Sequence, residues 1–299
     1  MRKFLFSVLV FVFFLGIIQT AKADLTRDCF NYIDAQDYQR ALQSGLEAVR
    51  IYPNSVGANL CVGVSYNRLG QYNQAIKYLK TAEKYATSKS DLRAIYNWEG
   101  IVYENLGDYN NALLYANRAL SLDIELGDKD GESKDLNNIA NIYQYLGDLD
   151  KALEYYKKAL AISDEKGKSA TYNNIAVIYS SKNEYDQAID YLKKAIAIDQ
   201  RFGNYDELAK DFLNLGNTYR AIKNYSEAEY YLKQGLLMEE KLGNKDLQGA
   251  AYLYFGKLYR DKGNKALARE YFTKAYNIFK SVGDEPDAQA AYQDLQELQ

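Results

Sequence analysis

Asparagine side chains recur in the middle of this sequence, in segments whose apolar spacing is that of a helix. They stand at 137–141 (NNIAN), 173–174 (NN) and 214–217 (NLGN). A primary amide donates two hydrogen bonds and accepts others through its oxygen, which suits the alternating N–H and C=O groups of an extended peptide backbone. Because asparagine is a mediocre helix former, its recurrence indicates a task other than forming the helix.

Several features on which catalysis commonly relies are missing. The chain has no histidine, which removes the commonest general base and the commonest metal ligand. Its two cysteines lack the spacing of metal ligands, and no glycine-rich phosphate-binding loop occurs. Adjacent acids such as Glu239 and Glu240 are interpreted as the solvated surface of a helix end. We therefore expect no enzymatic activity, no cofactor and no metal site.

The N-terminus has the pattern of an export signal. Two basic residues precede the apolar run 4–18, and Ala21-Lys22-Ala23 then places small residues at the spacing that signal peptidase reads. The run is shorter than the ~20 residues of a membrane-spanning helix. The pattern predicts a signal peptide over 1–23, cleavage before Asp24, and a periplasmic or extracellular mature protein. An uncleaved membrane anchor is the alternative.

Charge and cysteine content bear on the partner and the compartment. The chain carries 37 basic and 40 acidic side chains, whereas a nucleic-acid partner requires a basic surface. We therefore expect no nucleic-acid partner. In an oxidising compartment Cys29 and Cys61 can form a disulfide. Two small buried thiols are the alternative.

One unit recurs along the chain at intervals of 34 to 40 residues. An alanine marks each copy, a tyrosine stands nine residues before it, and a small residue stands twelve before it. Small residues on two helices let the helices approach closely, and the tyrosine ring fills the space beside that contact. The alanines are Ala41, Ala75, Ala112, Ala152, Ala188, Ala228 and Ala268, and the tyrosines are Tyr32, Tyr66, Tyr103, Tyr143, Tyr179, Tyr219 and Tyr259.

Glycines divide each unit into two helices. A glycine in the left-handed conformation ends a helix, so the pattern predicts helix, tight turn, helix and glycine stop. Asn183 takes the place of glycine in one copy, and Lys223 departs from the pattern in another. The glycines of the tight turns are Gly70, Gly107, Gly147 and Gly263, and those of the stops are Gly127, Gly167, Gly203, Gly243 and Gly283.

The unit resembles the tetratricopeptide repeat (TPR), with its small residue, tyrosine, alanine and later aromatic residue. Its longer copies, which end in LGD-like or LGN-like stops, resemble the repeats of kinesin light chains. The resemblance implies an all-α TPR solenoid, a right-handed superhelix of stacked helical hairpins. Seven hairpins are expected over 24–285, and a capping helix over 286–299, where Pro286 suits the first turn.

One side of the first helix of each unit is expected to line a concave groove. In related TPR proteins groove asparagines hold bound peptides, which is what the resemblance implies here. The basic residues of this side add a preference for carboxylates. The predicted peptide-binding residues are Asn137, Asn138, Asn141, Asn173, Asn174, Lys210, Asn214, Asn217, Arg220, Lys257 and Arg260.

The first three units differ from the later ones. Gly45 replaces a bulky residue and Glu99 occupies a usually apolar column, so these units are expected to pack more loosely. Trp98, the single tryptophan, is either a binding anchor or a packed ring. The columns of the groove hold apolar residues in these units, which suggests an apolar pocket lined by Phe30, Ile33, Leu60, Val64 and Ile101.

The sequence therefore predicts an exported, non-enzymatic scaffold or adaptor of the cell envelope. It would bind an extended peptide or a segment of a partner protein in its groove. Two alternatives stay open. The asparagines can pin neighbouring helices to each other with no ligand, and the protein can be a self-associating homo-oligomer or a membrane-tethered scaffold.

Overall fold

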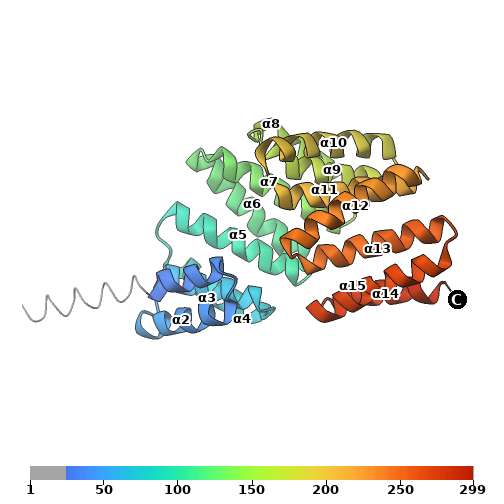
Figure 1. Cartoon of the computed structure of the whole chain (residues 1–299). Coiled ribbons are helices and arrows are strands. Elements are labelled where there is room, and N and C mark those ends of the chain that lie inside the picture. Colours follow the sequence, from blue (N-terminus) through green and yellow to red (C-terminus); the bar gives the residue numbers. More distant parts are fainter. Residues whose placement is uncertain (1–24, 299) are drawn as a thin grey trace, which may run out of the picture. The chain divides into compact units, whose positions relative to one another are not determined.

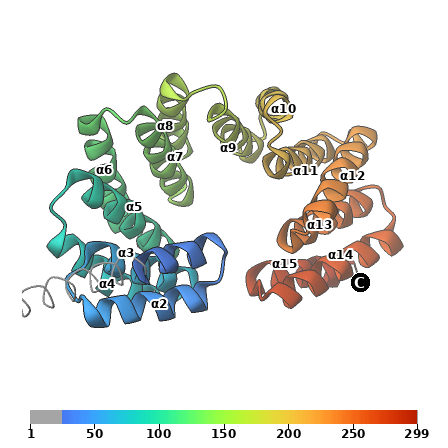
Figure 2. The ribbon, with the colours of Figure 1, turned by 60° about the vertical axis from the view of Figure 1, so that its left-hand side comes forward.

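The computed structural model describes residues 25–298, so the predicted signal peptide lies outside the described residues. Every regular element in this part of the chain is an α-helix (Figures 1 and 2). The predicted all-α fold of helical hairpins is confirmed. No described helix is long and apolar enough to cross a membrane.

The chain divides into two compact units at Ala152. In the first unit residues 25–34 are helical. The helices that follow pair in chain order, α3 with α4 and α5 with α6, and the first helices α3 and α5 also touch each other. These helices are α2 (Tyr38–Ile51), α3 (Val56–Arg68), α4 (Tyr72–Tyr85), α5 (Lys89–Asn105), α6 (Tyr109–Leu126) and α7 (Lys129–Tyr145), and α8 (Leu149–Ile162) contains the boundary.

The second unit repeats the arrangement, and the second helix of each of its hairpins has 18 residues. Helix α9 pairs with α10, α11 with α12 and α13 with α14, and the first helix α11 contacts both α9 and α13. The last helix, α15, packs on α14 and has Pro286 in its first turn. The helices are α9 (Lys168–Ser181), α10 (Tyr185–Phe202), α11 (Tyr205–Ala221), α12 (Tyr225–Leu242), α13 (Lys245–Asp261), α14 (Lys265–Val282) and α15 (Glu285–Gln296).

The recurring spacing of small and aromatic residues determines the contact between the two helices of each hairpin. All seven marker alanines are fully buried. Beside them, in several hairpins, the tyrosine of the first helix stacks on a tyrosine of the second, with ring centroids 5.6 Å apart for Tyr219 and Tyr231 and 5.5 Å apart for Tyr259 and Tyr271. The close helix contact and the stacked rings give these hairpins similar geometry, which places equivalent residues on equivalent faces.

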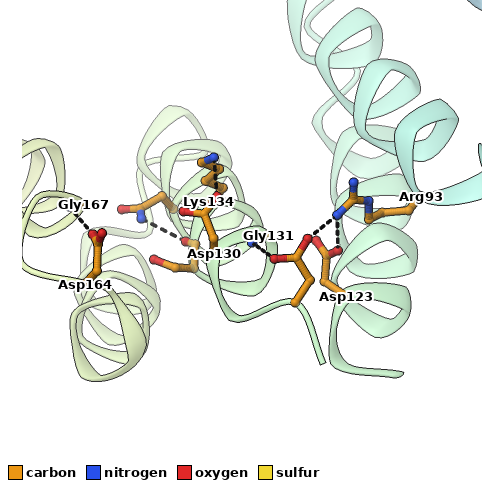
Figure 3. Close-up of polar contacts among 10 residues, drawn as sticks. Arg93, Asp123, Asp130, Gly131, Lys134, Asp164 and Gly167 are labelled. Carbon is orange, nitrogen blue, oxygen red and sulfur yellow. Dashed lines mark hydrogen bonds and ion pairs between the residues drawn. The ribbon is translucent and has the colours of Figure 1, made fainter. Parts of the chain in front are cut away.

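Left-handed residues end the helices at almost every predicted position. The four tight-turn glycines and four of the five stops have φ between 70° and 82°. In the three remaining tight turns Gln36, Asn183 and Lys223 adopt φ of 58°, 61° and 62°. The prediction for Gly167 is wrong, because its φ is −65° and it directly precedes α9. Helix α8 ends earlier, at Ile162, and the Asp164 side chain accepts a 2.6 Å hydrogen bond from the Gly167 backbone N–H (Figure 3).

Cys29 and Cys61 are joined by a disulfide, with Cα atoms 6.4 Å apart. The bond explains why Gly45 stands where other units have a bulky residue. A Cβ atom on Gly45 would lie 2.9 Å from the Cys29 Sγ atom and 2.7 Å from the Val62 side chain. The first hairpins therefore pack closely around the disulfide, rather than loosely as predicted.

Candidate functional site

Asn173 joins two first helices of the second unit, α9 and α11. Its Nδ2 group donates to the Oδ1 atom of Asp211, and its Oδ1 atom accepts a 3.0 Å hydrogen bond from Asn214 Nδ2. Asp211 is fully buried, so the amide compensates a carboxyl group that water does not reach. Both the nitrogen and the oxygen of the Asn173 amide thus bond to a neighbouring helix. This agrees with the alternative in which the asparagines pin helices to each other and bind no ligand.

Beside this bridge lies an open pocket of about 310 Å³, formed by residues of α9, α10, α11 and α13. Asn214 and Asn217 contribute amides to it, and Tyr254 contributes a half-buried phenol ring. The pocket belongs to the face on which the sequence placed the groove. Its lining residues are Ala176, Val177, Ser180, Ser181, Leu192, Asn214, Asn217, Thr218 and Tyr254.

Some polar atoms of the pocket are already engaged. Thr218 donates a 2.8 Å hydrogen bond to the backbone oxygen of Asn214, so Ser180 is the donor in its 3.3 Å contact with Thr218. The Asn217 Oδ1 atom accepts a 3.0 Å bond from Arg220 Nε. Within the described residues this leaves the Nδ2 group of Asn217 and the Oδ1 atom of Asn214 without partners, one donor and one acceptor on adjacent turns of α11.

The predicted groove cations are paired with acids. Arg220 forms an ion pair with Asp261 of α13, and Lys210 lies 2.8 Å from Glu207 of its own helix. Arg260 binds Asp294 and Glu297 near the C-terminal end, the latter at 3.1 Å. Among the predicted cations of this unit only the half-buried Lys257 forms no ion pair within the described residues. The two arginines therefore link neighbouring helices, and three of these four cations are already paired with acids of the protein.

The remaining predicted residues are half-buried on first helices. In α7 the Asn137 Nδ2 group donates a 2.9 Å hydrogen bond to the Ser133 backbone oxygen. On the same helix, but outside the predicted set, Lys134 pairs with Asp130 at 2.6 Å on the surface (Figure 3). Half-buried positions are taken by Asn138, Asn141 and Asn174.

Buried carboxyl groups are the main feature that the sequence analysis missed. Asp135 of α7 faces Asp123 of α6, and burial together with that neighbour raises the pKa of Asp135 to about 8. Arg93 reaches Asp123 at 2.9 Å from α5 (Figure 3). In the second unit Asp211 faces Asp199, and burial raises the pKa of Asp211 to about 8 although Asn173 opposes the shift.

These pairs leave a trace in the sequence. Asp123 and Asp199 both stand eleven residues after a marker alanine, and Asp135 and Asp211 both stand seventeen before the next one. The signal is therefore an acid at each of two repeat positions that face each other in the fold. A comparison limited to acids that are adjacent in the sequence misses these pairs, because their two members lie on different helices.

Two further glutamates are also buried. The interpretation of Glu239 as solvated surface is wrong, because its side chain is 0% exposed and burial raises its pKa to about 7. It occupies the same column as Asp123 and Asp199, which faces the next unit. Glu99 is likewise fully buried, and its pKa is raised to about 7 by burial, with Lys80 3.0 Å away. In residues 25–298 no group of such side chains has the geometry of a metal site.

The apolar residues of the first units serve the core. Val64 is 1% exposed, Leu60 and Trp98 pack against the buried cluster around Leu79, and Phe30 packs against the disulfide. The Arg68 guanidinium lies 5.4 Å above the Trp98 ring. These contacts support the interpretation of Trp98 as a packed ring, and the apolar pocket stays a prediction.

Sequence profiles and solved structures agree on the fold. Tetratricopeptide repeat profiles match residues 91–165 and 168–238 and residues 62–88 and 249–281. No curated protein matches the chain. The apo form of RapI is 19% identical with a TM-score of 0.66, covering 81% of this chain and 97% of that one.

Two further structures share the architecture. A Rap protein complexed with Competence and Sporulation Factor is 15% identical with a TM-score of 0.60, over 93% of this chain and 97% of that one. Cut9, from an APC/C hetero-tetramer with Hcn1, is 17% identical with a TM-score of 0.64, over 93% and 52%. At these identities the likeness shows the fold alone. The profile matches, which cover most of the repeats, establish that this chain belongs to the tetratricopeptide repeat family.

Proposed function

We propose that this protein is a non-enzymatic scaffold that binds an extended peptide, or an extended segment of a partner protein, on the first helices of its second unit. The observation that carries the proposal is the unpaired donor of Asn217 beside the unpaired acceptor of Asn214 in an open pocket. One N–H donor and one acceptor on adjacent turns match the C=O and N–H groups of a peptide backbone.

The bridge at Asn173 supports this assignment. Because Asn173 fixes the side chain of Asn214 from α9, and Arg220 fixes that of Asn217 from the next turn, both amides are held before a ligand arrives. Preorganised groups lose little conformational entropy on binding. The solved Rap complex with Competence and Sporulation Factor and the Cut9–Hcn1 assembly are consistent with a binding role for this architecture.

The test is a selection from a phage-displayed library of random 12-residue peptides against residues 24–299, followed by titration of synthetic peptides. Asn217→Ala should weaken binding about tenfold, since a lost hydrogen bond contributes ~0.5–1.5 kcal/mol. Asn277→Ala, on an exposed position of α14 in the same unit, should change nothing. Failure to select any peptide, or equal affinity of the two variants, would contradict the proposal.

We further propose that the protein is exported. The apolar run and the small residues at 21–23 support it, and so does the disulfide between Cys29 and Cys61, since such bonds persist mainly in oxidising compartments. N-terminal sequencing of the protein purified from its native cells decides the point. A chain that starts at Asp24 is expected, and one that starts at Met1 contradicts cleavage.

A further inference from the structure

The pocket beside Asn214 offers no unpaired charge to a ligand. The guanidinium of Arg220 is bound to Asp261 and to Asn217, and Lys210 is paired with Glu207. The nearest buried carboxyl group, Asp211, is covered by the amide of Asn173. A charge placed in this site finds no opposite charge and loses part of its hydration, which is costly. A ligand carboxylate or ammonium would therefore be disfavoured there.

The same pocket has apolar surface to cover. Ala176, Val177 and Leu192 line it together with the ring of Tyr254. Burial raises the pKa of the Tyr254 hydroxyl, so the phenol stays neutral. At about 310 Å³, the pocket lies at the small end of the roughly 300–1,000 Å³ that is typical of ligand sites. That space holds a side chain and the adjoining peptide group, and an aliphatic side chain would gain by covering the apolar wall.

We propose that this pocket selects one uncharged, aliphatic side chain of the bound segment, while Asn214 and Asn217 hold the peptide group next to it. The inference rests on the proposed function and makes it specific. It also replaces the carboxylate preference expected from the sequence, because three of the four cations that suggested it, Lys210, Arg220 and Arg260, are paired with acids of the protein.

The experiment uses a positional-scanning array of acetylated, amidated hexapeptides probed with residues 24–299. One position should prefer leucine, isoleucine, valine or methionine, and aspartate, glutamate, lysine or arginine at that position should weaken binding at least about tenfold. If no hexapeptide binds, the proposed function itself fails. If hexapeptides bind but every position accepts acidic residues, the proposed function stands and this inference is overturned.

A variant that fills the pocket tests whether the side-chain preference arises from this pocket. Val177→Phe puts a ring into the pocket from a half-buried position and should weaken the preferred hexapeptide about tenfold. Ser181→Phe, from an exposed position on the lining, provides a second variant that leaves the core untouched. Ala197→Phe, on an exposed position of α10 outside the pocket, is the matched control. Equal affinity of both pocket variants and the control overturns the assignment.

Discussion

The Nδ2 group of Asn214 donates a 3.0 Å hydrogen bond to the Oδ1 atom of Asn173, which joins two first helices that are neighbours in the second unit. The first unit has a similar link, in which Asn105 of α5 donates at 3.0 Å to Asn67 of α3. Asparagines of the first helices thus join neighbouring helices in both units, and in the second unit Asn214 also lines an open pocket.

Replacing Asn173 tests how much the bridge between helices contributes to stability. Asn173→Ala removes the amide that compensates the buried Asp211, so the free energy of unfolding should fall by about 1–3 kcal/mol. Asn174→Ala changes the neighbouring, half-buried amide and should stay within about 0.5 kcal/mol of the wild type. Urea denaturation measures both. If both variants lost a similar amount of unfolding free energy, the bridge would contribute no more to stability than an ordinary half-buried amide.

Stability should rise as the pH falls from 9 to 6. The folded-state pKa values of Asp135 and Asp211 are about 8 and those of Glu99 and Glu239 about 7, all raised by burial from ordinary values near 4. The folded state therefore binds protons more tightly than the unfolded state. The resulting stabilisation is fully present below the unfolded-state pKa values and is lost as pH rises through 7 and 8.

Urea denaturation at several pH values checks this dependence. The opposite shift of Glu229, whose pKa is lowered to about 2 chiefly by a hydrogen bond from Lys233, acts only below its unfolded pKa and does not enter this range. Asp135→Asn combined with Asp211→Asn should flatten the slope between pH 6 and 9. A slope of the opposite sign in the wild type would mean that the buried acids are charged in the folded state.

Glycines in the same column of two units should respond differently to alanine. A Cβ atom on Gly216 would lie 2.9 Å from the backbone nitrogen of Leu232, whereas on Gly100 the nearest atom would be 3.6 Å away. Gly216→Ala should therefore destabilise the protein by about 1–3 kcal/mol through overpacking. Gly100→Ala should be neutral or stabilising by up to ~1 kcal/mol, because alanine favours the helix. Thermal unfolding of the two variants provides the comparison, and equal effects would refute the packing argument.

The disulfide should contribute to the stability of the first unit. It joins residues separated by 32 positions, a loop for which the chain-entropy estimate is about 4 kcal/mol. Thiol titration of the denatured, unreduced protein should find no free thiol, and reduction should lower the midpoint of unfolding. Two free thiols in protein from the native compartment would show that Cys29 and Cys61 are not bonded there.

Repetition made the fold predictable from the sequence. The marker alanines and the tyrosines meet one local requirement, the close approach of two helices. The turn glycines meet another, a positive φ. In nearly every unit the same residue type satisfies the same requirement. Gly167 is the exception, since α8 ends early and the neighbouring Asp164 caps the turn instead. A change in helix length depends on packing beyond the repeat, which the pattern does not contain.

The site was less predictable because free atoms depend on partners from other helices. The sequence identifies Asn173, Asn214 and Arg220 as facing one side, but Asp211 and Asp261 decide which of their atoms remain available. Tyr254 and Val177 line the pocket without any polar pattern to mark them. Glu239 and Glu240 are adjacent acids, and the interpretation from the sequence places both on the surface. Adjacent residues of a helix point to different faces, so Glu240 is exposed whereas Glu239 is buried.

The most direct test of the central claim is an NMR titration of ¹⁵N-labelled protein with a peptide selected from the library. The side-chain amide signals of Asn217 should shift saturably with the added peptide, because the Nδ2 group gains the hydrogen bond that it lacks in the free protein. The signals of Asn277 on α14 should stay in place. Saturable binding that moves Asn277 and leaves Asn217 unchanged would contradict the assignment of this face as the binding site.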